Sequence, residues 1–149
     1  MGTQQNDTTE IRESILCIAD EISKYRAVDV SHVGYVGFRS KQYERFYSLT
    51  QIATDNELIV LTDHKDEKVR AYTFWALGKR NYSDIKIILE KHLTDTASFV
   101  FHQGCVFRSQ KVNYFFLDIL TPNRVDEFCF KLTTQEVSHI YQKIKEMTE

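Results

Sequence analysis

The sequence has little of what tight turns, membrane spans and disulfide frameworks require. It contains one proline and five glycines, whereas these two residue types together make up about 12% of an average protein. Tight turns depend on glycine and proline, so their scarcity argues against collagen-like chains and many-turned β architectures. No run approaches the roughly 20 apolar residues that cross a bilayer. The polar first residues also contain no apolar stretch typical of a secretory signal.

The chain also has few cysteines and a small net charge. The three cysteines, Cys17, Cys105 and Cys129, are odd in number and widely spaced, which predicts unpaired thiols in the reducing cytoplasm. The 19 basic and 21 acidic residues leave a formal net charge of −2. Such a balance gives no overall attraction to nucleic acid or an anionic membrane. We therefore expect no membrane partner and disfavour a nucleic-acid partner.

Apolar residues recur at helical spacing along nearly the whole chain. Isoleucines at 11, 15, 18 and 22 form one such stripe, and we expect Ser40, Asp66 and Ser109 to cap the helices that follow them. Residues 28–33 and 128–130 alternate only briefly, too little to outweigh the helical background. The sequence predicts a single all-α domain of short antiparallel helices. Its expected parts are an N-terminal helix over 8–26, a core over 40–120 and a C-terminal helical extension over 121–149.

Residues 58–78 resemble a HEAT-type helical repeat. In that family a leucine-rich helix leads through a polar turn into a second helix that ends Ala-Leu-Gly. The matching positions here are Asp66, Val69, Arg70, Ala76, Leu77 and Gly78. Asp66 and Arg70, four residues apart, are also placed for a weak ion pair. Phe74 and Trp75 replace small residues of the family pattern. Because this helix is apolar on several faces, we expect both to be buried. The resemblance implies an α-α superhelix that acts as a scaffold and binds another protein without catalysis.

No constellation of catalytic or metal-binding residues stands out. His102 and Cys105 have the spacing of two zinc ligands or of a Cys–His dyad, but no second ligand pair or orienting group accompanies them. The Gly34-x-x-Gly37 segment is too short for a phosphate-binding loop. We therefore predict no catalytic residue, no metal and no cofactor. Two alternatives stay open: a nucleic-acid-binding or DNA-repair-type helical-repeat enzyme, and a small toxin-neutralising, immunity-type protein.

The tripeptide Phe-Arg-Ser occurs twice, at 38–40 and 107–109. If both serines cap helices that run in the same direction, both arginines lie at one edge of the fold, where arginine and free N–H groups suit an anionic group of a partner. The alternative is that Phe38 and Phe107 only staple the helix starts. The predicted partner-binding residues are Arg39, Arg108, Tyr35 and His102.

Overall fold

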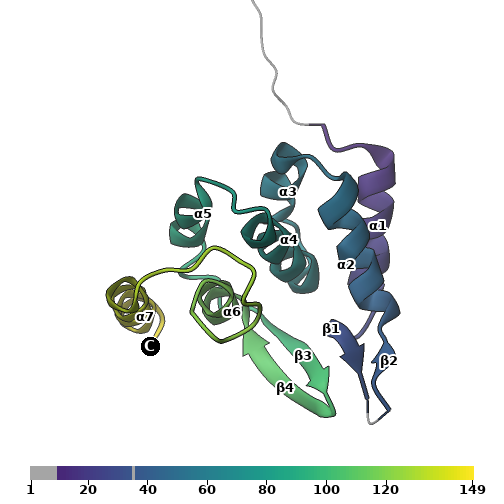
Figure 1. The fold of residues 1–149 in the computed structure, drawn as a ribbon. Helices are drawn as coiled ribbons and strands as arrows, with labels where there is room; N and C mark the ends of the chain where they lie inside the picture. The colour runs from purple at the N-terminus through teal and green to yellow at the C-terminus, as the bar shows by residue number, and fades with distance from the viewer. Residues whose placement is uncertain (1–9, 35) are drawn as a thin grey trace, which may run out of the picture.

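The computed structural model describes residues 10–34 and 36–149 (Figure 1). Their elements in chain order are α1 Glu13–Lys24, β1 Val28–Val33, β2 Phe38–Arg39, α2 Lys41–Ile52, α3 Asp55–Leu61, α4 Glu67–Lys79, α5 Ile85–Lys91, β3 Ser98–Gly104, β4 Val106–Lys111, α6 Val112–Ile119 and α7 Thr134–Thr148. The all-α prediction is wrong, because 15% of the described residues form strands alongside 53% in helices. The strands make one mixed sheet, so the protein has an α/β fold.

The sheet consists of two hairpins laid side by side. Its strand order is β2-β1-β3-β4. The central strands β1 and β3 run parallel, with Val28 opposite Phe101, and each pairs antiparallel with its own hairpin partner. Parallel strands need a long crossover connection, and here the helices α2 to α5 provide it (Figure 1).

Several helix starts agree with the sequence prediction. Ser40 accepts a hydrogen bond from the backbone N–H of Tyr43, and Asp66 caps α4 in the same way. The predicted cap at Ser109 is wrong, because Ser109 lies inside β4 and α6 begins only after Lys111. The N-terminal helix is shorter than 8–26, and residues 8 and 9 lie outside the described part of the chain.

Helix α4 forms the centre of the hydrophobic core. Phe74 and Trp75 are both buried, as predicted. Phe74 stacks on Phe116 of α6 with ring centroids 4.0 Å apart, and Trp75 stacks on Phe46 of α2 at 4.6 Å. The sheet packs onto the same core, where Phe99 and Phe101 of β3 meet Phe115 of α6 edge to face. The expected helical-repeat stack is therefore replaced by helices packed against a sheet.

The segment that resembles a HEAT-type repeat has a structural role in its turn. The Arg70 guanidinium donates to both carboxylate oxygens of Asp95, at 2.8 and 3.1 Å, and also to the carbonyls of His64 and Lys65. Asp66 pairs with Lys68 instead of Arg70, so the predicted ion pair between positions 66 and 70 is wrong. Gly78, in the Ala76-Leu77-Gly78 end of α4, lets α6 approach closely through Ile119. In the described part of the chain, no helix has the length and apolar character needed to cross a membrane.

Candidate functional site

Both hairpin turns lie at the same end of the sheet. This follows from the parallel arrangement of β1 and β3, since each strand is followed directly by its turn. The backbone N–H of Gly34 donates to the carbonyl of Gly104 at 2.8 Å and joins the two turns. Gly34, Gly37 and Gly104 all have positive φ, a conformation that glycine adopts without steric cost. Three of the five glycines therefore shape this one end of the fold.

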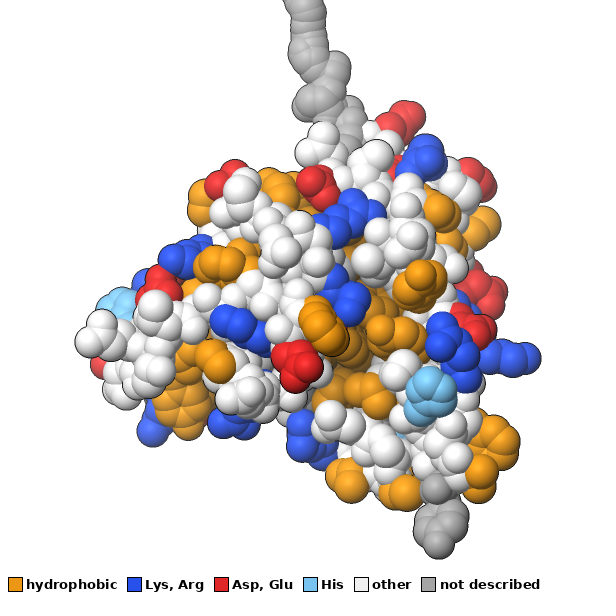
Figure 2. All heavy atoms as spheres, in the orientation of Figure 1, with side chains coloured by type: hydrophobic (Ala, Val, Ile, Leu, Met, Phe, Trp, Pro, Cys, Tyr) orange, Lys and Arg blue, Asp and Glu red, His pale blue; other side chains and the backbone are white. Residues whose placement is uncertain are grey.

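Apolar side chains extend from both turns into solvent. Val36 and Phe38 of the first hairpin are 74% and 69% exposed, and Val106 and Phe107 of the second are 58% and 52% exposed. Phe107 lies opposite His102 and Val106 opposite Gln103, so these two side chains point to opposite faces and the group surrounds the end of the sheet. We call these four residues the hairpin patch. Figure 2 shows hydrophobic side chains gathered around this lower end of the molecule. Single exposed apolar residues are ordinary, whereas a group of them marks an interaction surface.

The two hairpin segments contribute basic but no exposed acidic side chains to the surroundings of the hairpin patch. The segments 25–40 and 98–111 contain a single acidic residue, Asp29, and that side chain is buried. The cations are Arg26, Arg39, Arg108 and Lys111. The Arg26 guanidinium lies 5.6 Å from the Phe107 ring centre, and Arg108 lies 5.4 Å from that of Phe101. The patch is thus apolar with a positive rim.

A buried polar group lies directly beneath Phe107. Its ring stacks on His102 with centroids 3.8 Å apart, and the Nδ1 atom of His102 lies 3.4 Å from Oδ1 of Asp29. His102 and Asp29 are 4% and 1% exposed, and these two atoms have no hydrogen-bond partner within the described residues. The other carboxylate oxygen of Asp29 accepts from the Ser40 hydroxyl at 2.8 Å.

The cluster of Asp29, Ser40 and His102 has the residue types of a hydrolase triad without the geometry of one. The Ser40 hydroxyl donates to the aspartate, whereas an activated nucleophile would donate to the histidine. Ser40 also caps α2, which fixes its orientation. Both ionisable side chains are enclosed, so no substrate reaches them. We interpret the cluster as support for the sheet under the hairpin patch.

The side chain of Tyr72 completes the backbone pairing of Asp29. The two residues of β2 pair only with His32 and Val33, so Asp29 has no strand beside it on that edge. The Tyr72 hydroxyl accepts from the Asp29 N–H at 2.7 Å and donates to its carbonyl at 2.8 Å. Burial raises the pKa of this phenol well above its ordinary value. The hydroxyl thus stays protonated and able to donate.

The four predicted partner-binding residues differ in their surroundings. Arg39 is exposed and forms an ion pair with Glu44 at 2.9 Å. Arg108 is exposed on β4, while His102 is buried and cannot contact a partner directly. Tyr35 lies outside the described residues. The predicted helix-start edge is wrong at Arg108, because the second Phe-Arg-Ser lies in a strand.

The sequence prediction missed the exposed apolar residues of the hairpin patch and the burial of Asp29. Phe38 is exposed, so it does not staple the start of α2. The Gly34-x-x-Gly37 spacing was the available signal for the first turn, because glycines at that spacing can reverse a strand. No sequence signal pairs Asp29 with His102, which are 102 − 29 = 73 positions apart.

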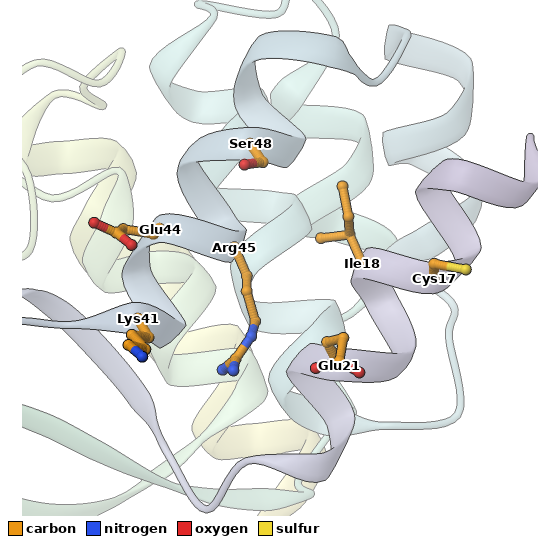
Figure 3. Close-up of a pocket in the computed structure, with 7 residues that line it drawn as sticks. All are labelled: Cys17, Ile18, Glu21, Lys41, Glu44, Arg45 and Ser48. Carbon is orange, nitrogen blue, oxygen red and sulfur yellow. The ribbon is translucent and has the colours of Figure 1, made fainter.

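A groove between α1 and α2 is the other surface feature of interest (Figure 3). Cys17, Ile18 and Glu21 line it from α1, and Arg45 reaches towards it from α2. The rim mixes acidic and basic side chains, and the groove is open to solvent. It therefore favours no particular class of ligand. Among the described residues, no group of three or more His, Cys, Asp and Glu side chains is placed to hold a metal ion.

No protein-family model matches the sequence, and neither does any curated protein.

Proposed function

We propose that this chain is a non-enzymatic module that binds another protein through the hairpin patch. The observation that carries the proposal is the display of four apolar side chains, each more than half exposed, at the shared end of two hairpins. Keeping such a surface in water is unfavourable, and covering it with a partner removes that cost. Aromatic residues such as Phe38 and Phe107 are of the type that anchors protein interfaces.

The chemistry of the patch favours a protein over a nucleic acid. A nucleic-acid surface needs several cations placed along the phosphate backbone. Here the centre is apolar, the cations lie at the rim, and Arg39 is already neutralised by Glu44. A partner with apolar side chains and carboxylates would match both the centre and the rim.

Site-specific photo-cross-linking tests the proposal. A photoreactive residue is placed at Phe38 or at Val106 in the full chain, which is then irradiated in native cell lysate. Ile87 on α5 is the matched control, because it is 58% exposed, as Val106 is. We expect one partner protein to be captured at positions 38 and 106 and not at 87. Equal capture at all three positions, or none at 38 and 106, would refute the proposal.

Affinity measurements with the captured partner give the second test. The double variant Phe38→Ser with Val106→Ser should bind at least about tenfold more weakly, because truncating an interface anchor costs about 1–2 kcal/mol or more. Both side chains are exposed, so the melting temperature should change little. Ile87→Ser should leave both affinity and melting temperature unchanged. An unaltered affinity in the double variant would contradict a role for the patch.

A further inference from the structure

Strand β4 is the long free edge of the sheet. It is last in the strand order and has six residues, five of them exposed. Among the described residues, backbone hydrogen bonds join Val106–Lys111 only to β3. The opposite edge strand, β2, has two residues and leads directly into α2. Of the two edge strands in the described residues, β4 alone is long enough to serve as a template for another strand.

The backbone of β4 has groups that remain to be paired. Along an antiparallel edge strand, every second residue directs its N–H and C=O away from the neighbouring strand. An extended segment beside β4 would satisfy these groups with main-chain hydrogen bonds, and the side chains of β4 would set which segment fits.

The cations of β4 indicate the charge of such a segment. Arg108 lies on the same face as Phe101, and Lys111 lies on the face of Ser98. Neither cation forms an ion pair with any carboxylate in the described part of the chain, whereas Arg39 on the other edge is paired with Glu44. Arg108 and Lys111 therefore favour carboxylates on a neighbouring strand.

The β4 strand of a second copy of the chain does not supply carboxylates opposite Arg108 and Lys111. Two β4 strands paired antiparallel about their centre would bring two Arg108 side chains close together, and residues 106–111 contain no acid to offset them. Like charges on adjacent strands are destabilising. The occupant that fits is an acidic segment of a different protein.

We propose that β4 receives an extended, acidic segment of the partner protein as a fifth strand of the sheet. This inference rests on the proposed function and names the partner's chemistry. In the antiparallel orientation, we expect a segment of six residues. Counted from its N-terminus, positions 1 and 4 are acidic, positions 5 and 6 are apolar, and positions 2 and 3 can be any residue. Its two acids would then face Lys111 and Arg108, and its two apolar residues would face Phe107 and Val106.

The probe is an eight-residue peptide with blocked ends that contains this pattern. The control peptide has lysine in place of both acids. Amide hydrogen exchange of the full chain is followed residue by residue as peptide is added up to millimolar concentration. We expect the acidic peptide to slow exchange in β4 at least threefold and to leave α4 and α5 unchanged. The lysine peptide should have no effect.

Charge reversal supplies matched variants. Arg108→Glu with Lys111→Glu should weaken binding of the acidic peptide at least tenfold and create binding of the lysine peptide. Lys65→Glu with Lys91→Glu changes the net charge equally at two exposed lysines outside the sheet, and should leave binding unaltered. Circular dichroism and the melting temperature verify that each variant is folded.

The outcomes separate this inference from the proposed function. Absence of β4 protection by the acidic peptide, or equal protection by the lysine peptide, overturns strand addition. If cross-linking at positions 38 and 106 still captures one partner, the proposed function stands without it. If the acidic peptide protects β4 but cross-linking at positions 38 and 106 captures no partner, the hairpin patch is not the binding surface. In that case only the binding of an acidic peptide to β4 is supported.

Discussion

Replacing Tyr72 with phenylalanine removes one oxygen atom and should destabilise the protein far more than the small change suggests. The ring would remain in place, fully buried and stacked on Phe46 with centroids 4.8 Å apart. What is lost is the hydroxyl that pairs with both the N–H and the C=O of Asp29. Phenylalanine offers neither a donor nor an acceptor, so both backbone groups would be left buried without a partner.

The expected cost follows from those two groups. A buried donor or acceptor left without a partner costs about 1–3 kcal/mol, so Tyr72→Phe, which leaves two such groups, should lower the free energy of unfolding by about 2–6 kcal/mol. For a chain of this length, that corresponds to a decrease of about 4–24 °C in melting temperature. Urea denaturation followed by tryptophan fluorescence and far-UV circular dichroism measures the free energy, and coincident transitions would justify a two-state fit.

Tyr43→Phe is the matched control. Tyr43 belongs to the same aromatic cluster, with its ring 5.2 Å from Phe46 and 6.0 Å from Trp75. Its hydroxyl has no hydrogen bond to any of the described residues, so removing it should change the free energy of unfolding by less than about 0.5 kcal/mol. If Tyr72→Phe behaves like Tyr43→Phe, the Tyr72 hydroxyl does not complete the edge of β1.

Two further variants test the interior and the helix start of α3. Hydrogen bonds from the Arg12 side chain lower the pKa of Glu57 to about 2, with help from the backbone N–H groups of Thr54 and Arg12. A carboxylate whose pKa is lower in the folded state stabilises the protein at neutral pH and loses that effect as the pH falls from about 4.5 to 2. Glu57→Gln should therefore cost about 1–2 kcal/mol at pH 7, through the capping box of α3 and the ion pair with Arg12, whose exposed guanidinium is screened by solvent. At pH 2, close to the pKa of Glu57 in the folded protein, most of this cost should be gone. A cost independent of pH in urea titrations would contradict this. Gly78→Ala should lower the free energy of unfolding by about 1–3 kcal/mol, because the new methyl group would lie 3.2 Å from Ile119 and 3.3 Å from Cys129. A rise in the urea midpoint would contradict this and show that the neighbouring side chains move aside.

The local signals in the sequence were accurate where the structure depends on near neighbours. Ser40 and Asp66 cap helices because a cap bonds only two or three residues ahead. Phe74 and Trp75 are buried because α4 is apolar on nearly every side, a property of thirteen consecutive residues. Such features need no knowledge of the rest of the chain.

The same local signals were misleading around Ser109. Phe107, Arg108 and Ser109 match residues 38–40, and the first tripeptide does lead into a helix. The second forms an edge strand because β3 is present beside it, with Phe101 opposite Arg108. Pairing with a neighbouring strand outweighs a capping preference worth about 1 kcal/mol.

The sequence by itself determined most of the helices, the caps at Ser40 and Asp66 and the apolar centre of the core, because these depend on periodicity and on contacts a few residues apart. Only the tertiary structure decided the sheet. Val28 meets Phe101, and Asp29 meets His102, across about half the length of the chain. No local pattern encodes pairing at that separation. The same long-range pairing brings both hairpin turns to one end and leaves β4 at the edge. The surface proposed here for binding therefore exists only once the chain has folded.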